Sequence, residues 1–323
     1  MNGKKITVLI MAAGTGGHVF PALAIAQQLK NNSVNVEWLG TPQGMENSLV
    51  AMTDIPLHRV SVKGLRGTGV LRWLSAPFML SIALFQSLKV IRKVKPNCVL
   101  GMGGFICGPA GIATKLLGKP LLIHEQNAVP GLTNKWLSRF SRKVFEAFPN
   151  TFANKVGAIY TGNPLRNEIL SISNPSVSVS KGSGFNLLVI GGSQGSLAIN
   201  KVIPELAVNW SSTASLNIRH QTGSTNLQET LLHYEKLGLQ IGDNIVVEPF
   251  INEMAEAYNW ADMVICRSGA STVSELAAVG LPSILVPYPH HKDQQQLLNA
   301  KWLAESGGAS IIEQKHFLSL IHI

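Results

Sequence analysis

The chain has 323 residues, of which 46% are hydrophobic and 14% are charged. It is therefore too apolar for a disordered protein and long enough for two domains of ordinary size. Its net charge of +9 is unevenly spread, because residues 1–164 carry +13 (18 Lys and Arg, 5 Asp and Glu) and residues 165–323 carry −4 (9 and 13). The basic half indicates an anionic partner such as nucleic acid, acidic lipid or a pyrophosphate, and the alternative is a basic surface that serves solubility.

Three cysteines, Cys98, Cys107 and Cys266, form an odd and unclustered set without the spacing of metal ligands. We expect them to be packing residues in a reducing compartment. The first residues include the basic Lys4 and Lys5 before an apolar run, as a signal peptide does. That run is short and leads directly into a glycine loop, so it predicts a first strand.

Short apolar strands alternate with helices through the first half of the chain. This pattern predicts a buried parallel sheet with helices on both faces. The expected strands are residues 6–11, 35–39, 58–62, 98–100 and 120–124. The expected helices are one that begins at about Pro21 and others near residues 45–52, 71–94 and 109–117.

Residues 174–184 are rich in Ser and Gly, as a linker or surface loop is. The alternation then resumes, and with a boundary near residues 160–166 we expect one domain of residues 1–164 and a second of residues 165–323. The strands expected in the second domain are residues 185–190, 216–220, 244–247, 263–266, 282–286 and 309–312. The predicted fold class is α/β with two doubly wound domains, whose ligands bind at the carboxyl ends of the strands.

A strand, a glycine loop and a helix follow one another once in each half. Residues 14–18 (GTGGH) follow the first strand, and residues 191–195 (GGSQG) follow the strand at 185–190. Glycine lets the backbone approach a ligand closely, and a helix start presents unpaired N–H groups with a partial positive charge, so each loop is a candidate phosphate site. Two such loops favour a transferase with two phosphate-bearing ligands over an enzyme with one cofactor.

Two ionisable residues stand at predicted helix starts. His18 is favoured there as a neutral imidazole and is a candidate general base, and a capping or packing role is the alternative. Glu275 falls in the first turns of a helix that is expected to start within residues 267–275, after the strand at 263–266. Its carboxylate can accept two hydrogen bonds from a ribose, or it can compensate the helix dipole.

Polar runs lie at or after the ends of two further predicted strands. Residues 124–127 (HEQN) and 294–296 (QQQ) carry amide and other polar groups that can hydrogen-bond the hydroxyls of a sugar. The adjacent His290 and His291 lack a third ligand at a suitable spacing, so a metal site is not expected there.

Three motifs are absent from the sequence. Without a D-x-D pair there is no carboxylate clamp for a metal-bound nucleotide sugar, and without G-x-x-x-x-G-K-[ST] there is no Walker-type ATPase. A dinucleotide dehydrogenase is a distant alternative, because the first loop lacks the third spaced glycine and Glu37 lies before the end of its predicted strand.

Residues 73–88 carry no charge, yet they are too few to span a bilayer. Basic residues flank them, namely Arg66 and Arg72 before and Lys89, Arg92, Lys93 and Lys95 after. An amphipathic helix with basic flanks suits an anionic membrane surface, and the alternative is an ordinary core helix of the first domain.

Six ordered blocks of the sequence resemble the MurG family of bacterial glycosyltransferases, and the similarity extends from residue 6 to about residue 314. The blocks are residues 14–21, 101–104, 124–127, 162–166, 191–195 and 266–269. The resemblance implies a GT-B fold, with two Rossmann-like domains that face a cleft. It also implies inverting, metal-independent transfer of N-acetylglucosamine (GlcNAc) from UDP-GlcNAc to the C4 hydroxyl of the muramic acid unit of lipid I. The product would be lipid II for peptidoglycan synthesis, and no cofactor is expected.

The same resemblance implies roles for individual residues. His18 corresponds to the base for the attacking hydroxyl, and Asn127 is expected to be catalytic with it. Phe250 would cap the uracil, Ile251 would read it through its backbone, and Glu275 would bind the ribose. The other implied substrate-binding residues are Thr15, Gly16, Gly17 and Asn127 for the sugar or acceptor, Arg166, Ser193, Ala270, Ser271, Thr272, Val273 and Ser274 for the diphosphate, and Gln295 and Gln296 for the sugar.

The implied partners are UDP-GlcNAc, lipid I and an anionic membrane surface at the cytoplasmic face of the bacterial inner membrane, without nucleic acid. Members of the family usually continue beyond residues 311–314 with further helices, so we expect a truncated or altered C-terminal end here. Two alternatives remain open. One is another GT-B transferase that uses a UDP-sugar, and the other is a catalytically weak, membrane-docked scaffold of the same fold.

Overall fold

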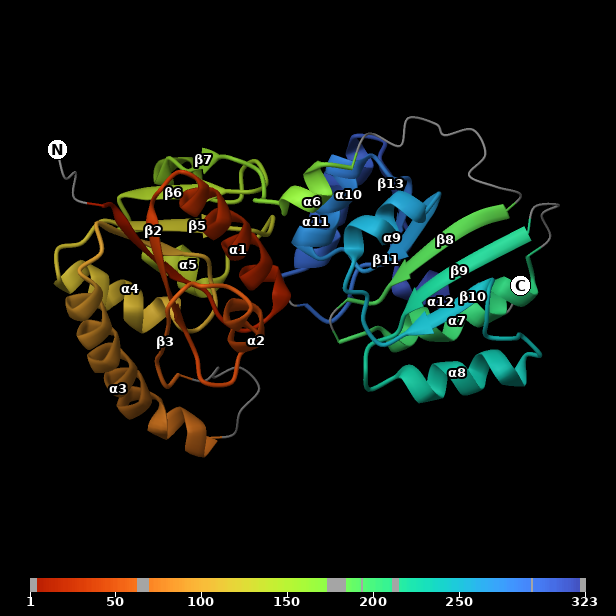
Figure 1. Cartoon of the computed structure of the whole chain (residues 1–323), viewed down its shortest axis with the longest axis horizontal. Coiled ribbons are helices and arrows are strands. Elements are labelled where there is room, and N and C mark those ends of the chain that lie inside the picture. The colour runs from red at the N-terminus through yellow and green to blue at the C-terminus, as the bar shows by residue number, and fades with distance from the viewer. Residues whose placement is uncertain are drawn as a thin grey trace. The chain divides into compact units, whose positions relative to one another are not determined.

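The computed structural model describes residues 5–62, 70–172, 184–192, 194–210, 215–291 and 293–319, the side chains of residues 70–75, 318 and 319 excepted. The chain divides into two compact units, Met1–Arg166 and Asn167–Ile323, which Figure 1 draws from red to green and from green to blue. Most of the predicted linker, residues 174–183, lies outside the described residues, and Gly184 already begins a strand.

The first unit contains a parallel sheet of seven strands in the order β3-β2-β1-β4-β5-β6-β7. The strands are β1 (Thr7–Met11), β2 (Asn35–Gly40), β3 (Leu57–Arg59), β4 (Cys98–Gly101), β5 (Leu121–Glu125), β6 (Lys143–Glu146) and β7 (Ile159–Tyr160). The helices are α1 (Gly16–Asn31), α2 (Glu46–Ala51), α3 (Val70–Val94), α4 (Cys107–Leu116), α5 (Leu132–Leu137) and the 3₁₀ turn η1 (Asn154–Val156).

Side chains alternate along the buried strands, so both faces of this sheet carry apolar side chains. Helices cover both faces. Leu9 and Met11 of β1 pack in a core with residues of α3, α4 and α5, whereas Val8 and Ile10 pack with residues of α1 and α2. The fully buried Trp38 of β2 lies in the second core and donates its indole N–H to the carbonyl of Ala12 over 2.9 Å. This bond ties the end of β1 to its neighbour.

The second unit repeats the design with six parallel strands in the order β10-β9-β8-β11-β12-β13. The strands are β8 (Gly184–Ile190), β9 (Ser215–Gln221), β10 (Ile245–Glu248), β11 (Met263–Cys266), β12 (Ser283–Leu285) and β13 (Ala309–Ile311). The helices are α6 (Asn167–Leu170), α7 (Leu197–Val208), α8 (Leu227–Lys236), α9 (Met254–Trp260), α10 (Ala270–Val279), α11 (Gln295–Glu305) and α12 (Gln314–Ser319). Helices α7, α8 and α12 cover one face of the sheet, and α9, α10 and α11 cover the other (Figure 1).

The predicted doubly wound α/β architecture is therefore confirmed in both units. One predicted helix start was wrong, since α1 begins at Gly16 and not near Pro21. The ring of Pro21 leaves only the carbonyl of Gly17 without its helical donor, and Gly17 is exposed, so water can satisfy that carbonyl. The short strands β6 and β7 at one edge of the sheet were not predicted.

Helix α3 is amphipathic, with one part of its surface in the core and another exposed. Ala83 and Ile91 are buried in the core, while Phe78 and Phe85 are 72% and 61% exposed. No helix in the part of the chain that the structure describes is both long and apolar enough to cross a membrane.

Candidate functional site

The first glycine loop joins β1 to α1 and places His18 in the first turn of the helix. Gly14 has φ of +103°, a conformation that favours glycine, and Thr15 is the N-cap residue of α1. The amides of His18 and Val19 donate to the carbonyl of Thr15 over 3.1 and 3.3 Å. These predicted site residues follow the carboxyl end of β1. Thr15 and Gly17 are exposed there, and His18 is half-buried.

A buried carboxylate, that of Glu46, binds the backbone of this loop. Glu46, at the start of α2, is fully buried and accepts hydrogen bonds from the Gly14 amide (3.1 Å), the Thr41 amide (2.7 Å) and the Thr41 hydroxyl (2.8 Å). In turn the Met45 amide donates to the carbonyl of Gly14 over 3.4 Å. The loop is therefore held at both the amide and the carbonyl of Gly14, and no sequence pattern indicates this role for Glu46.

The third glycine cluster, residues 101–104, supports the imidazole of His18. A Cβ atom at Gly103, where φ is +103°, would lie only 2.8 Å from ring atoms of His18. A Cβ atom at Gly104 would lie 2.6 Å from the carbonyl oxygen of Ala13. Both positions need glycine, because the cluster packs directly against the first loop and its histidine.

The predicted polar run at the end of β5 divides into inner and outer residues. His124, Glu125 and Gln126 are buried and bond to protein groups, while Asn127 is half-buried. Gln126 Oε1 lies 2.9 Å from Nδ1 of His18, so β5 and α1 bring two predicted blocks together. The three buried residues are therefore placed to organise the site from within.

Glu125 fixes the loop that carries Asn127. Its carboxylate accepts hydrogen bonds from the Asn127 amide and side chain (3.1 and 3.2 Å), the Gly131 amide (3.1 Å) and the Asn134 side chain (2.9 Å). Four donors to one buried carboxylate keep Asn127 in place next to Gln126.

Arg166 is the last residue of the first unit. Its guanidinium carbon lies 5.1 Å from the centre of the Phe20 ring, which is a cation–π contact with the second turn of α1. The Asn163 side chain, three residues earlier, donates to the backbone carbonyl of Gln126 over 3.0 Å. The block at 162–166 is thus joined to both the α1 block and the β5 block.

In the second unit, the start of α10 collects most of the predicted diphosphate and ribose residues. Ala270, Ser271, Thr272, Val273, Ser274 and Glu275 form its first six positions, after Gly269 as N-cap. The Ser271 Oγ is buried and has no hydrogen-bond partner among the described residues. Glu275 is buried and accepts a hydrogen bond from the Tyr258 hydroxyl of α9 over 2.9 Å.

The second glycine loop follows β8. Gly192 and Gly195 have φ of +87° and +76°, and a Cβ atom on Gly195 would collide with the carbonyl of Thr222. Ser196 caps α7 by accepting from the amide of Ile199 over 3.5 Å. The predicted diphosphate residue Ser193 lies outside the described residues.

The remaining predicted donor residues lie on the loop after β10 and at the start of α11. Phe250 is exposed and Ile251 is buried directly after the end of β10. Gln295 and Gln296 begin α11, and the Gln296 side chain accepts from the Tyr288 amide over 2.9 Å. Gln296 also accepts at its backbone carbonyl from the hydroxyl of the buried Ser268 (2.8 Å), which links α11 to the loop before α10.

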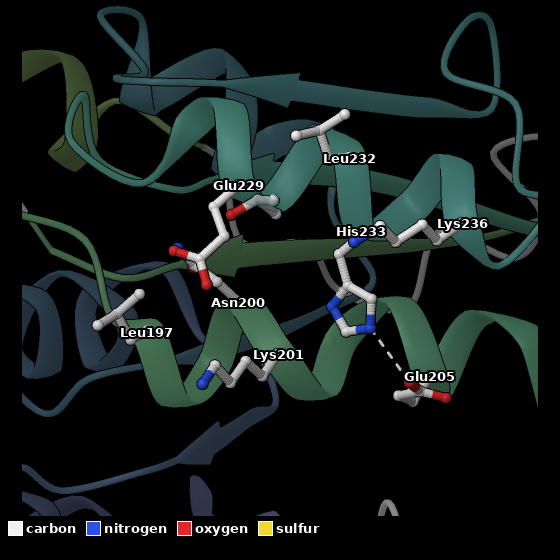
Figure 2. A pocket seen from close by; sticks show the side chains of 9 residues that line it. Leu197, Asn200, Lys201, Glu205, Glu229, Leu232, His233 and Lys236 are labelled. Carbon is white, nitrogen blue, oxygen red and sulfur yellow. Dashed lines mark hydrogen bonds and ion pairs between the residues drawn. The ribbon is translucent and has the colours of Figure 1, made fainter.

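A cavity of about 330 Å³ lies between α7 and α8. Figure 2 shows that its walls carry charged side chains, among them Lys201, Glu229 and the His233–Glu205 pair with 3.1 Å between its atoms. None of the residues predicted to bind substrate lines this cavity. It carries neither a glycine loop nor a strand end, and we assign no chemistry to it.

The cysteines and histidines of the described chain do not gather into a ligand set. No group of three or more His, Cys, Asp or Glu residues that could hold a metal ion occurs in those parts of the chain. Cys107 and Cys266 are fully buried, and burial raises the pKa of each thiol to about 12. Their burial agrees with the expected packing role, and the raised pKa disfavours the thiolate form that acts as a nucleophile.

Comparison with known proteins covers nearly the whole chain. The glycosyltransferase family 28 N-terminal domain matches residues 8–146, and the glycosyltransferase family 28 C-terminal domain matches residues 186–322. The UDP-N-acetylglucosamine--N-acetylmuramyl-(pentapeptide) pyrophosphoryl-undecaprenol N-acetylglucosamine transferase of Mannheimia succiniciproducens is 49% identical over 312 residues, which cover 96% of this chain and 86% of that protein. The protein of the same name from Pseudomonas fluorescens is 48% identical, covering 95% of this chain and 85% of its own.

Solved structures agree with these sequence matches. The crystal structure of Acinetobacter baumannii MurG is similar with a TM-score of 0.75 and 42% identity, covering 96% of this chain and 86% of that one. The UDP-GlcNAc 2-epimerase from Neisseria meningitidis, bound to UDP-GlcNAc, gives a TM-score of 0.66 at 13% identity, with 98% and 92% of the two chains covered. The second likeness concerns the fold alone.

Proposed function

Because this chain belongs to the MurG family within glycosyltransferase family 28, we propose that it transfers GlcNAc from UDP-GlcNAc to the C4 hydroxyl of the N-acetylmuramyl sugar of lipid I. The product is lipid II, a precursor of peptidoglycan. The observation that carries this proposal is identity of 47–49% with transferases of that name over at least 95% of the chain. The ordered site around His18 agrees with it.

In the first unit, His18 acts as the general base. Its Nε2 takes the proton of the C4 hydroxyl as that oxygen forms a bond to C1 of GlcNAc, and the bond from C1 to the phosphate oxygen breaks with its electron pair moving to UDP. A single displacement of this kind inverts the configuration at C1. Asn127, on the loop held by Glu125, and the exposed Thr15 and Gly17 with the neighbouring Gly16 form the contacts to the sugar or acceptor.

In the second unit, the start of α10 binds the donor diphosphate. Backbone amides of residues 270–272, which have no acceptor within the helix, and the buried Ser271 hydroxyl, which has no partner in the described chain, supply donors to the departing UDP, assisted by Ser193 and Arg166. Glu275 accepts hydrogen bonds from the ribose, Phe250 and Ile251 bind the uracil, and Gln295 and Gln296 contact the sugar. Helix-start donors stabilise the leaving phosphate without a metal ion, in agreement with a sequence that lacks D-x-D.

The first unit also docks on the cytoplasmic face of the inner membrane. Support comes from the net charge of +13 in residues 1–164 and from the exposed Phe78 and Phe85 of α3, with the Lys89 ammonium 5.8 Å from the Phe85 ring. Flotation with vesicles tests this point. Binding to vesicles with acidic lipid, reduced in a Phe78→Ser/Phe85→Ser variant, is expected, and equal binding to neutral vesicles would contradict it.

The activity is tested with radiolabelled UDP-GlcNAc and a lipid I analogue, in the presence of a chelator. We expect labelled lipid II, undiminished by the chelator, and a 10²- to 10⁴-fold lower kcat for His18→Ala, the range that general-base catalysis contributes. Panels of other UDP-sugars and acceptors separate this reaction from that of another UDP-sugar transferase. Unchanged turnover in the His18→Ala variant would contradict the proposed role of His18 as the general base.

A further inference from the structure

A chain of hydrogen bonds connects His18 to a fixed backbone carbonyl through two other side chains. His18 Nδ1 lies 2.9 Å from Gln126 Oε1, Gln126 Nε2 lies 3.0 Å from His124 Nδ1, and His124 Nε2 lies 3.1 Å from the carbonyl oxygen of Gly162. All four residues belong to the first unit. The direction of every bond in this chain can be worked out from its far end.

At the far end, the carbonyl oxygen of Gly162 can only accept a hydrogen bond, so Nε2 of His124 must carry a proton. His124 is 3% exposed, and burial lowers the pKa of its imidazole, which keeps the ring neutral. A neutral ring protonated at Nε2 has a lone pair at Nδ1. His124 Nδ1 is therefore an acceptor that faces Gln126.

The amide of Gln126 has only one orientation that satisfies its surroundings. Its NH₂ group faces two acceptors, the Nδ1 lone pair of His124 and the backbone carbonyl of His124, each at 3.0 Å. The reversed amide would bring its oxygen against both of these acceptors. Gln126 is fully buried, so no bulk water relieves that repulsion.

With its NH₂ group committed, Gln126 presents an oxygen to His18. An amide oxygen accepts, so Nδ1 of His18 must be the nitrogen that carries the proton. Gly103 packs against the same ring, because a Cβ atom there would lie 2.8 Å from its Nδ1 and Cε1. No hydrogen bond to Nε2 of His18 occurs within the described part of the chain.

We infer that Gln126 is a positioning residue that holds neutral His18 in the Nδ1–H tautomer and thereby leaves the lone pair on Nε2. This inference rests on the proposed role of His18 as the base. When Nε2 has taken the proton of the acceptor hydroxyl, Nδ1–H continues to donate to the same oxygen of Gln126. The network therefore serves both protonation states of His18 without rearrangement, and it uses a neutral amide where other catalytic histidines use a carboxylate.

The tautomer can be read directly in the full-length protein. Two-bond ¹H–¹⁵N correlation spectra of protein with ¹⁵N-labelled histidine rings, recorded at pH 8, distinguish protonated from unprotonated ring nitrogens, and His18→Ala assigns the His18 signals. We expect a single Nδ1–H tautomer for His18 and the opposite Nε2–H tautomer for His124. An Nε2–H tautomer at His18, or Nδ1–H at His124, overturns the inference without any variant of Gln126.

The variant Gln126→Met keeps the length of the side chain and removes the strong acceptor. We expect a mixture of His18 tautomers and at least a tenfold lower kcat, with the KM for UDP-GlcNAc within about twofold of the original, since general-base catalysis contributes roughly 10²- to 10⁴-fold. The matched control is Thr114→Val, which removes a buried hydroxyl bond to Ala110 in the same unit and is expected to change neither the tautomer nor kcat.

An unchanged tautomer or an unchanged kcat in Gln126→Met overturns the inference. The proposed base fails on a different result, namely full activity of His18→Ala, which leaves the tautomer measurement on the original protein valid. The two failures are therefore distinguishable.

Discussion

The hydroxyl of Tyr258 donates a hydrogen bond to the carboxylate of Glu275 over 2.9 Å, and both side chains are buried. The bond joins α9 to α10. It holds the carboxylate proposed to bind ribose before any nucleotide arrives, and a prepositioned carboxylate costs less on binding than one that must be ordered.

Replacing Tyr258 by Phe removes this bond and keeps the aromatic packing. We expect the KM for UDP-GlcNAc to rise by about three- to tenfold and stability to fall by about 1.5–3 kcal/mol, the range for a hydrogen bond to a charged group. Steady-state kinetics and urea unfolding measure the two effects. The control is Tyr234→Phe, which loses a 3.0 Å bond to His220 in the same unit and is expected to lower stability without changing KM.

The first glycine loop depends on the buried carboxylate of Glu46. In Glu46→Ala the amides of Gly14 and Thr41 lose their acceptor, so we expect a stability loss of about 1–3 kcal/mol and a 10- to 100-fold lower kcat from a displaced His18 loop. Glu146→Ala also removes a buried carboxylate that accepts from two backbone amides of the first unit. Similar kcat losses in both variants would show that general destabilisation, and not the loop, is responsible.

Gly103 is expected to tolerate no side chain. In Gly103→Ala the new Cβ strains a backbone with φ of +103° at a cost of about 1–3 kcal/mol and displaces the ring of His18. We expect a fall in kcat of about 10²-fold or more in the transfer assay. Gly118→Ala is the comparison, because φ is +64° there and nothing lies within 4 Å of the new Cβ. Equal activity of the two variants would contradict the contact.

The pH dependence of stability should reveal the buried His220. Its ring bonds to Tyr234 and Asn200, and burial lowers its pKa from 6.5 to about 3. In the unfolded chain His220 takes up a proton near pH 6.5, whereas in the folded chain it stays neutral down to about pH 3. The contribution of this group to stability is therefore complete above pH 6.5 and is lost as the pH falls below that value. The expected slope from this group is about 1.4 kcal/mol per pH unit, and His124 adds to it in the same direction.

Urea unfolding of the original protein and of His220→Gln, from pH 7 down to pH 4, checks this expectation. The variant cannot titrate at this position, so the two free energies of unfolding should converge as the pH falls. Curves that remain parallel would mean that His220 does not change its protonation on unfolding.

The sequence was sufficient for the architecture because the central parallel strands are short, mostly apolar runs with a glycine a few residues after each strand end. The runs that became β1 and β11 show this, since Gly14 and Gly269 follow them closely. This pattern does not identify short edge strands, since β7 (Ile159–Tyr160) is exposed and only two residues long. Pro21 misled the prediction because proline commonly opens a helix, whereas here the glycines before it are already helical.

The site was predictable where residues follow strands and unpredictable where they act from a distance along the chain. His18 and Glu275 stand at helix starts and could be selected from the sequence alone. Glu46 is 32 residues from Gly14, and Tyr258 is 17 residues from Glu275. Spacing gives no signal for such pairs, because tertiary packing brings them together. Gln126 was visible in its block, but its partner His18 is 108 residues away.

Every strand pair of the described chain lies within one of the two units, and the two sheets share one winding order, with the first strand of each unit at the switch point. Exchange of one half for that of a related transferase at residues 166 and 167 would break no ladder in either sheet. Under the proposed assignment of the lipid-linked sugar to the first unit and the nucleotide sugar to the second, the two selectivities can change separately during evolution, and hybrid enzymes become a practical route to new combinations of substrates.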